Sequence, residues 1–175
     1  MDPSPLKIRL YGDPCLRKKS VPVKEVGPSE RMLFDAMIAT MRQAKGVGLA
    51  APQIGINQRF FVMDVGNGPL VIINPRITKK VGWCSVEEGC LSIPEVTVMI
   101  KRSQGITVRF MNEDNKMMEM TCEDLMARVI QHETDHLNGK LILNYASHKE
   151  KIKFRDQLKA LESQYKSKSK NDPNP

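Results

Sequence analysis

The chain has 175 residues, which is enough for one domain with its own hydrophobic core and too few for a second full domain. No stretch approaches the roughly 18 to 20 continuous apolar residues of a membrane helix, and the N-terminal residues lack the basic and then apolar segments of a signal peptide, so we expect a cytoplasmic protein without membrane contact. The net charge of +7 is uneven: from Lys149 onward Lys and Arg outnumber Asp and Glu by eight to four, which suits nucleic acid or another polyanion and is equally typical of a solvated helix face.

The chain begins with an irregular arm and a helix. Residues 1–27 mix Pro, Gly and short apolar pieces, which predicts an irregular segment on the surface of the domain. From Ser29, which can cap a helix, apolar residues recur at helical spacing until Gly46 ends the pattern. The following GVGLAAPQIG, residues 46–55, is too rich in Gly and small residues for a stable helix or a central strand, so we expect a loop with close backbone approach.

Five short segments rich in Val, Ile, Phe or Met follow, and turns containing Gly, Pro, Asn or Asp separate them. This pattern is typical of β-strands. The predicted strands are residues 59–65, 70–74, 96–100, 106–110 and 116–120, with a hairpin turn at residues 112–115.

Two more helices are expected in the last third of the chain. The first begins at TCED, where Thr121 can cap and Asp124 stands three residues later, and it ends at Gly139. One face of this helix carries both apolar residues and histidines, namely Leu125, Val129, His132 and His136. The second, residues 148–165, is amphipathic, and residues 166–175 are predicted to be a basic, disordered tail.

The expected fold class is therefore α+β. Mostly antiparallel sheets pack around the histidine-bearing helix, and residues 1–165 form a single catalytic domain with a C-terminal amphipathic helix.

Two histidines four residues apart on a helix can bind one metal ion from adjacent turns, and QHETDH provides such a pair in His132 and His136. Glu133 lies beside them, where its carboxylate can reach a water on the metal without binding the metal itself, as a general base requires. The same pattern also occurs by chance or as two core histidines, but two inward imidazoles would then need separate buried hydrogen-bond partners.

A catalytic metal site normally has three protein ligands and one open position, so a third ligand must be found. The extended pattern of one peptidase class requires a histidine where this chain has Ile142, which excludes that class. Other zinc peptidases use a downstream glutamate. Here Glu150 and Glu162 both lie in a Lys-rich amphipathic helix, after which too little chain follows for the second subdomain of those enzymes.

Cysteines offer a better third ligand. Cys122 is set aside because ten residues of helix would place it roughly 15 Å from His132. Cys15 and Cys84 are interpreted, like Cys122, as buried structural thiols. Cys90 is the better candidate because its segment, EEGCLSIP, contains a flexible glycine before it and a stiff proline after it, which can hold a thiolate in place.

Three motifs occur along the chain in a fixed order, GVGLAAPQIG, EEGCLSIP and QHETDHLNG. Because of these motifs, the chain resembles the peptide deformylases. These enzymes remove the formyl group from the N-terminal methionine of nascent bacterial and organellar proteins. The motifs span residues 46–139, and the segments on both sides also agree in length, so the resemblance covers nearly the whole chain.

The resemblance implies a role for each motif residue. Cys90, His132 and His136 bind the metal, and Glu133 is the general acid/base. Negative charge on the substrate oxygen is stabilised by Gln53 and the backbone N–H of Leu91, and Gly48 offers backbone hydrogen bonds to an extended substrate. The pocket for the methionine side chain draws on Val47, Leu125, Val129 and the ring of His132.

One residue does not fit a methionine pocket. Arg128 stands one turn before His132, where an apolar side chain is expected. It either reaches the rim of the pocket or points inward and alters it.

A thiolate with two imidazoles suits one divalent ion of zinc, iron, cobalt or nickel, and the resemblance implies Fe2+ in the cell. The expected partners are N-formyl-methionyl nascent peptides and, through the basic C-terminal helix, the ribosome.

Two alternative functions stay open. One is a metallopeptidase that cuts internal bonds, and the other is an RNA- or ribosome-binding module, whose structural metal would need four protein ligands where only three converge.

Overall fold

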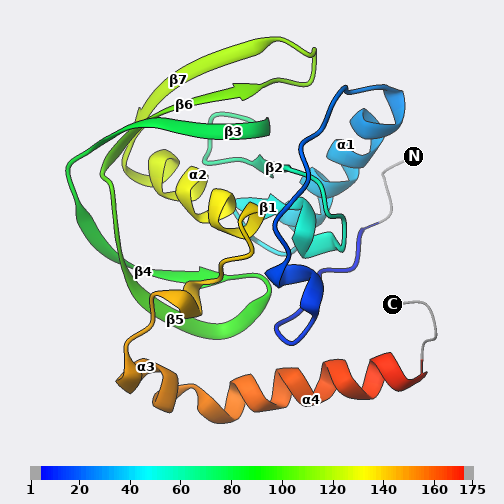
Figure 1. Ribbon diagram of the computed structural model, residues 1–175, viewed down its shortest axis with the longest axis vertical. Helices are drawn as coiled ribbons and strands as arrows, with labels where there is room; N and C mark the ends of the chain where they lie inside the picture. The colour runs from blue at the N-terminus through cyan, green and yellow to red at the C-terminus, as the bar shows by residue number, and fades with distance from the viewer. Residues whose placement is uncertain (1–4, 172–175) are drawn as a thin grey trace.

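The computed structural model describes residues 5–171, and the side chains of residues 5–167. Figure 1 shows helix α2 (Asp124–Leu137) enclosed between a five-stranded sheet and a two-stranded hairpin. The sheet has the order β1 (Gly48–Ala50), β2 (Phe60–Met63), β3 (Leu70–Val81), β6 (Gly105–Met111) and β7 (Met117–Glu123), and the hairpin consists of β4 (Cys84–Cys90) and β5 (Ile93–Arg102). All neighbouring strands are antiparallel, which confirms the predicted α+β class.

The other helices surround these layers. α1 (Pro28–Gln43) lies beside the β1–β2 end of the sheet, and α4 (Arg155–Asn171) runs along the hairpin side of the molecule (Figure 1). Shorter helical elements are η1 (Pro14–Arg17), η2 (Ala51–Ile54), η3 (Ile142–Asn144) and α3 (His148–Lys153). Among the residues that the structure describes, no helix combines the length and the apolar character needed to cross a bilayer.

Strand β2 is buried on both faces because the sheet is covered on both sides. Phe60 and Val62 belong to a cluster with α1 and the N-terminal arm, whereas Phe61 and Met63 belong to a second cluster with the apolar stripe of α2. A third cluster joins β5 to η3 and to Phe154. The sheet and the hairpin thus have separate hydrophobic cores, and α2 belongs to that of the sheet.

The arm is irregular over residues 5–27 as predicted, although η1 and a bridge between Val21 and Gln58 add local order. It does not simply lie on the surface, because Leu16, Val23 and Val26 are buried in the hydrophobic cores. The helix predicted from Ser29 to Gly46 is found as α1, but its N-cap is Gly27 rather than Ser29, and it ends at Gln43. The predicted strands are found with different ends, and β3 continues past Asn74 to Val81.

Two strands were not predicted. The Gly-rich segment contains β1, in which Gly48 pairs with Met63 of β2. Glycine weakens a strand, so the pairing with β2 and the burial of all three β1 residues stabilise it instead. The second is β4, whose two adjacent glutamates have low strand propensity.

The ends of the later helices also differ from the prediction. Thr121 is not a helix cap, because it lies in β7 and α2 begins only at Asp124. The hydroxyl groups of Thr121 and Thr107 form a hydrogen bond with each other. The helix predicted at residues 148–165 is interrupted at Phe154, which is buried and ends α3. α4 then continues to Asn171, where a disordered tail was predicted, and residues 172–175 lie outside the described residues.

Candidate metal centre

One cysteine and two histidines meet between the hairpin and α2. Cys90 ends β4, and its Sγ lies 3.3 Å from Nε2 of His136. That nitrogen lies 3.2 Å from Nε2 of His132, one helical turn earlier on α2. The three atoms all lie within 4.8 Å of one another.

These distances fit a common metal ion. A tetrahedral centre with metal–nitrogen bonds of about 2.0 to 2.1 Å and a metal–sulfur bond of about 2.3 Å places its ligand atoms about 3.3 to 3.6 Å apart. The two short contacts of His136 are close to those values. Burial lowers the pKa of His136 well below its usual value, which keeps this imidazole in the neutral form that binds metals.

The orientation of His132 is fixed by a carboxylate behind it. Its Nδ1–H donates to Oε2 of Glu88 at 3.0 Å, which leaves Nε2 facing the other two ligands. Burial alone would raise the pKa of Glu88, but hydrogen bonds from His132 and Arg102 outweigh it and lower that pKa to about 2. Glu88 is therefore ionised and acts as a permanent acceptor for His132.

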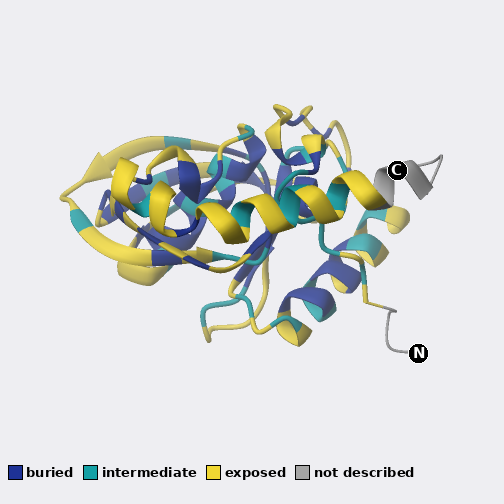
Figure 2. Cartoon of the chain, turned by 90° about the horizontal axis from the view of Figure 1, so that it is seen from below, coloured by how far each residue is buried: buried dark blue, intermediate teal, exposed yellow. Residues whose placement is uncertain are grey.

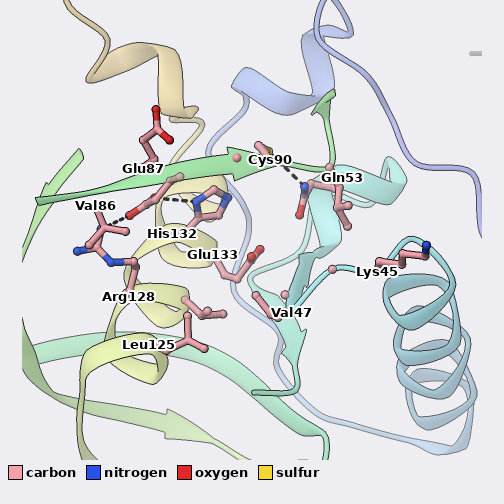
Figure 3. Close-up of a pocket in the computed structure, with 16 residues that line it drawn as sticks. Lys45, Val47, Gln53, Val86, Glu87, Cys90, Leu125, Arg128, His132 and Glu133 are labelled. Atoms are coloured by element: carbon pink, nitrogen blue, oxygen red, sulfur yellow. Dashed lines mark hydrogen bonds and ion pairs between the residues drawn. The ribbon is translucent and has the colours of Figure 1, made fainter. Parts of the chain in front are cut away.

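Glu133 lies beside the trio but is not part of it (Figure 3). Its side chain is buried, and Oε2 has no hydrogen-bond partner within the part of the protein that the structure describes. Burial raises the pKa of Glu133 to about 7. A carboxyl group with that pKa can accept and release a proton near neutral pH, as a general acid/base must.

Gln53 approaches Cys90 from the opposite side (Figure 3). It lies in η2, where its Oε1 accepts from the backbone N–H of Ala50 at 2.8 Å. Its Nε2 donates to the Ser92 hydroxyl at 3.2 Å and lies 3.7 Å from Cys90 Sγ. Because its oxygen is already bonded, the amide presents its N–H groups towards the metal centre.

An open pocket of about 440 Å³ leads to these groups. All the residues predicted to bind substrate line it: Val47, Gly48, Leu125 and Val129, together with Leu91. Leu125 lies at the exposed end of the α2 stripe, with 52% of its surface accessible, rather than pointing into the core. Lys45, Glu87 and Arg128 also line the pocket, but most of its surface is apolar, and an apolar wall beside reactive groups is typical of a site that binds an apolar side chain next to the reaction centre.

Gly48 has a further, unpredicted role. A Cβ at this position would lie 2.8 Å from Cδ of Glu133, so any other residue would displace the carboxyl group. Gly48 also lies on the edge strand of the sheet, where one side of the backbone is not paired with another strand.

Arg128 neither fills the pocket nor simply reaches its rim. The residue is only 8% exposed and forms part of the pocket wall, while its guanidinium turns towards β4. There it donates to Glu88 Oε1 at 2.6 Å and to the Sγ of Cys84 at 2.9 Å. The charge of Arg128 is thus paired with Glu88 and does not disturb an apolar pocket.

The other cysteines lie apart from the centre. Cys122 is buried in β7 within the sheet cluster, and Cys84 is half-buried at the start of β4. Cys15 is half-buried, with its thiol directed at the carbonyl of Pro52.

Sequence reasoning missed Glu88 and its partner Arg102. Glu88 stands two residues before Cys90, a spacing that places both on one face of a strand, but β4 was not predicted. Arg102 Nε and Nη2 bond both oxygens of Glu88 at 2.7 and 2.9 Å. Arg102 lies outside the three sequence motifs, so nothing in the sequence pointed to it.

Comparison with known proteins shows what the chain is similar to. Residues 5–152 match the polypeptide deformylase family. The chain is 49% identical over 153 residues to the peptide deformylase of Thermotoga petrophila, covering 87% of this chain and 93% of that protein. It is 39% identical over 168 residues to that of Hamiltonella defensa, with coverage of 94% and 98%.

Solved structures agree with the sequence comparison. The crystal structure of peptide deformylase from Thermotoga maritima has a TM-score of 0.80 at 49% identity, and covers 82% of this chain and 98% of its own. That from Legionella pneumophila has a TM-score of 0.86 at 37% identity, with coverage of 93% and 98%.

Proposed function

The chain belongs to the peptide deformylase family, and we propose that Cys90, His132 and His136 hold its metal ion while Glu133 moves the protons of the reaction. Members of this family are enzymes that remove N-formyl groups from nascent peptides, and the chain is therefore such an enzyme. The assignment of individual residues rests on one observation, the convergence of three ligand atoms beside Glu133 in a mostly apolar pocket. We propose Fe2+ as the ion in the cell, with Zn2+, Ni2+ or Co2+ able to replace it.

Each residue has a distinct task in the reaction. The bound metal supplies the Lewis acidity that makes a water acidic enough to attack near neutral pH. Glu133 accepts the proton of the attacking water and later gives it to the departing amine. Gln53 Nε2 and the backbone N–H of Leu91 donate to the formyl oxygen as negative charge develops on it, and such donors contribute about 3 to 4 kcal/mol each.

The pocket supports methionine as the residue next to the formyl group. The side chains of Val47, Leu125 and Val129 give it an apolar wall, and the backbone of Gly48 on the edge strand can pair with an extended peptide. The substrate would then lie along β1 with its N-terminus at Glu133.

Two variants and one control test this assignment. Glu133→Ala is expected to keep one metal ion per chain and lose at least about 100-fold in deformylation rate, because only the proton carrier is removed. Cys90→Ala is expected to lose the metal as well. Glu113→Ala, at the exposed hairpin turn, is the matched control and keeps both properties.

An active Glu133→Ala enzyme would contradict the role given to Glu133. Incubation with formyl-methionyl peptides and with blocked internal peptides separates deformylase from peptidase activity. Cleavage of the internal peptides alone would favour the peptidase.

We further propose that the enzyme works in the cytoplasm and that α4 contacts the ribosome there. Figure 2 shows α4 crossing the molecule as a mostly exposed helix, and Lys149, Lys151 and Lys159 are exposed on α3 and α4. Phe154 between them is buried, so deletion of this region would open the core. Replacing all three lysines by glutamate is therefore the better test. The measurement is the affinity for ribosomes and its dependence on salt concentration. If neither changes, the basis of this proposal is removed.

A further inference from the structure

The metal centre lies at the boundary between two hydrophobic cores. Its histidines come from α2, whose apolar residues pack with the sheet. Its cysteine comes from the β4–β5 hairpin, whose apolar residues Val96, Val98 and Ile100 pack with η3. The position of the hairpin relative to α2 therefore determines whether the sulfur and the two imidazoles meet.

Arg128 crosses this boundary. It belongs to α2, but its guanidinium hydrogen-bonds to the hairpin: Nη1 donates to Glu88 Oε1 at 2.6 Å and to the carbonyl of Ile100 at 3.3 Å. Nη2 donates to the carbonyl of Cys84 at 3.2 Å and contacts its Sγ at 2.9 Å. In Figure 3, dashed lines join Arg128 to a carboxylate and that carboxylate to His132.

Glu88 connects Arg128 to His132. Its Oε1 accepts from Arg128 and from Arg102 Nε, and its Oε2 accepts from Arg102 Nη2 and from His132 Nδ1. Arg102 is on the hairpin like Glu88, and it reaches α2 through Asp135 at 2.8 Å. Besides His132 itself, Arg128 is therefore the α2 residue that bonds Glu88 directly.

We propose that Arg128 is a positioning residue for the metal centre, which fixes Glu88 and through it the imidazole of His132. The inference rests on the proposed function, because it assumes that His132 binds the metal. Arg128 also holds β4 against α2 at the strand that ends in Cys90, so it acts on both sides of the centre.

A purely electrostatic role predicts the opposite result. Arg128 is a cation near a site for another cation, and removing it would strengthen metal binding by removing repulsion. A positioning role predicts that metal binding weakens. The sign of the change in metal affinity therefore separates the two.

Titration of the metal-free enzyme with Co2+ provides the test, because visible absorption reports the ligand geometry around cobalt independently of activity. Arg128→Met and Arg128→Lys are both expected to weaken Co2+ binding by about 10- to 100-fold and to change the spectrum. Lysine keeps the charge but lacks the guanidinium fork, so it does not rescue the contact. Arg109→Met, an exposed arginine paired with Glu119 on the sheet, is the control and binds Co2+ like the wild type.

A double-mutant cycle shows whether Arg128 acts through Glu88. In a Glu88→Gln background, Arg128→Met is expected to cause a smaller loss of affinity than in the wild type, and equal losses would overturn the proposal. Equal or tighter Co2+ binding by folded Arg128→Met would also overturn it. If Arg128→Met does not fold, as judged by circular dichroism, Arg128→Lys decides in the same way.

The two proposals fail differently. A wild type that binds one Co2+ and deformylates, with Arg128 variants equal to it, overturns this inference alone. A wild type that binds no Co2+ overturns the proposed function with it.

Discussion

Replacing Gly48 by alanine tests how tightly the pocket holds Glu133. The added Cβ would lie 2.8 Å from Cδ and 3.0 Å from Cγ of Glu133, whereas unstrained carbon contacts lie at about 3.5 to 4.0 Å. The carboxyl group must therefore move by about 1 Å. Glu133 is only 4% exposed, so it has little free space in which to do so without changing its aim.

The size of the effect follows from that displacement. A misplacement of about 1 Å in a reacting group costs about 100-fold in rate, which corresponds to about 2.7 kcal/mol of activation free energy. Gly48→Ala is thus expected to lower kcat on a formyl-methionyl peptide by about 100-fold while the bound metal stays at one ion per chain. Release of the free amine measures the rate, and elemental analysis measures the metal.

Gly105→Ala is the matched control. There the nearest atom to the added Cβ is Cγ of Glu123, an exposed and flexible side chain, at 3.3 Å, and the backbone oxygen of Cys122 lies at an ordinary contact distance of 3.7 Å, so activity is expected to stay near that of the wild type. A kcat for Gly48→Ala within threefold of the wild type would refute the reasoning, because it would mean that Glu133 can act from a displaced position.

Three further outcomes are expected. Gln53→Glu keeps the acceptor for Ala50 but loses the amide donor, so kcat measured on the same peptide falls by about 100- to 1,000-fold with the metal retained. Removing the metal with a chelator lowers the melting temperature by roughly 5 to 10 °C relative to enzyme with metal at about 100 times its Kd, and adding metal back restores it. Phe34→Ala removes a ring that packs edge-on against Phe60, with the ring centroids 5.0 Å apart, and is expected to lower the free energy of unfolding by about 3 to 5 kcal/mol. The metal affinity stays unchanged because this pair lies on the far side of the sheet from α2.

The candidate metal ligands were within reach of sequence reasoning because metal binding dictates the spacing of the histidines. Two histidines on one helix must stand about one turn apart to share an ion, and this spacing is visible in the sequence. The α+β class followed from short alternating strands and one strongly amphipathic helix. Spacing offers no rule for the cysteine, so Cys90 was chosen by setting the other thiols aside and from the Gly and Pro beside it, and the order of the motifs agreed with that choice.

The parts that sequence reasoning missed depend on tertiary contacts. β1 is a strand only because β2 and two covering layers stabilise a Gly-rich segment that has no strand propensity of its own. Glu88 reads as a surface charge until Arg102 and Arg128, both distant in sequence, are brought to it by folding. Arg128 itself was interpreted against an apolar helix face, and its partner on another element could not be inferred from that face.

The ion pairs around Glu88 are better explained by geometry than by stability. Removing such charges from water is costly, and well-packed apolar residues in their place often give equal or greater stability. Apolar residues, however, would leave Nδ1 of His132 without an acceptor, and they would impose no direction on its ring. Glu88 imposes that direction because both of its oxygens are already bonded to guanidinium groups from the hairpin and from α2. The carboxylate can therefore shift only if the hairpin and the helix shift with it, so the same contacts that orient His132 also fix the distance at which Cys90 meets it.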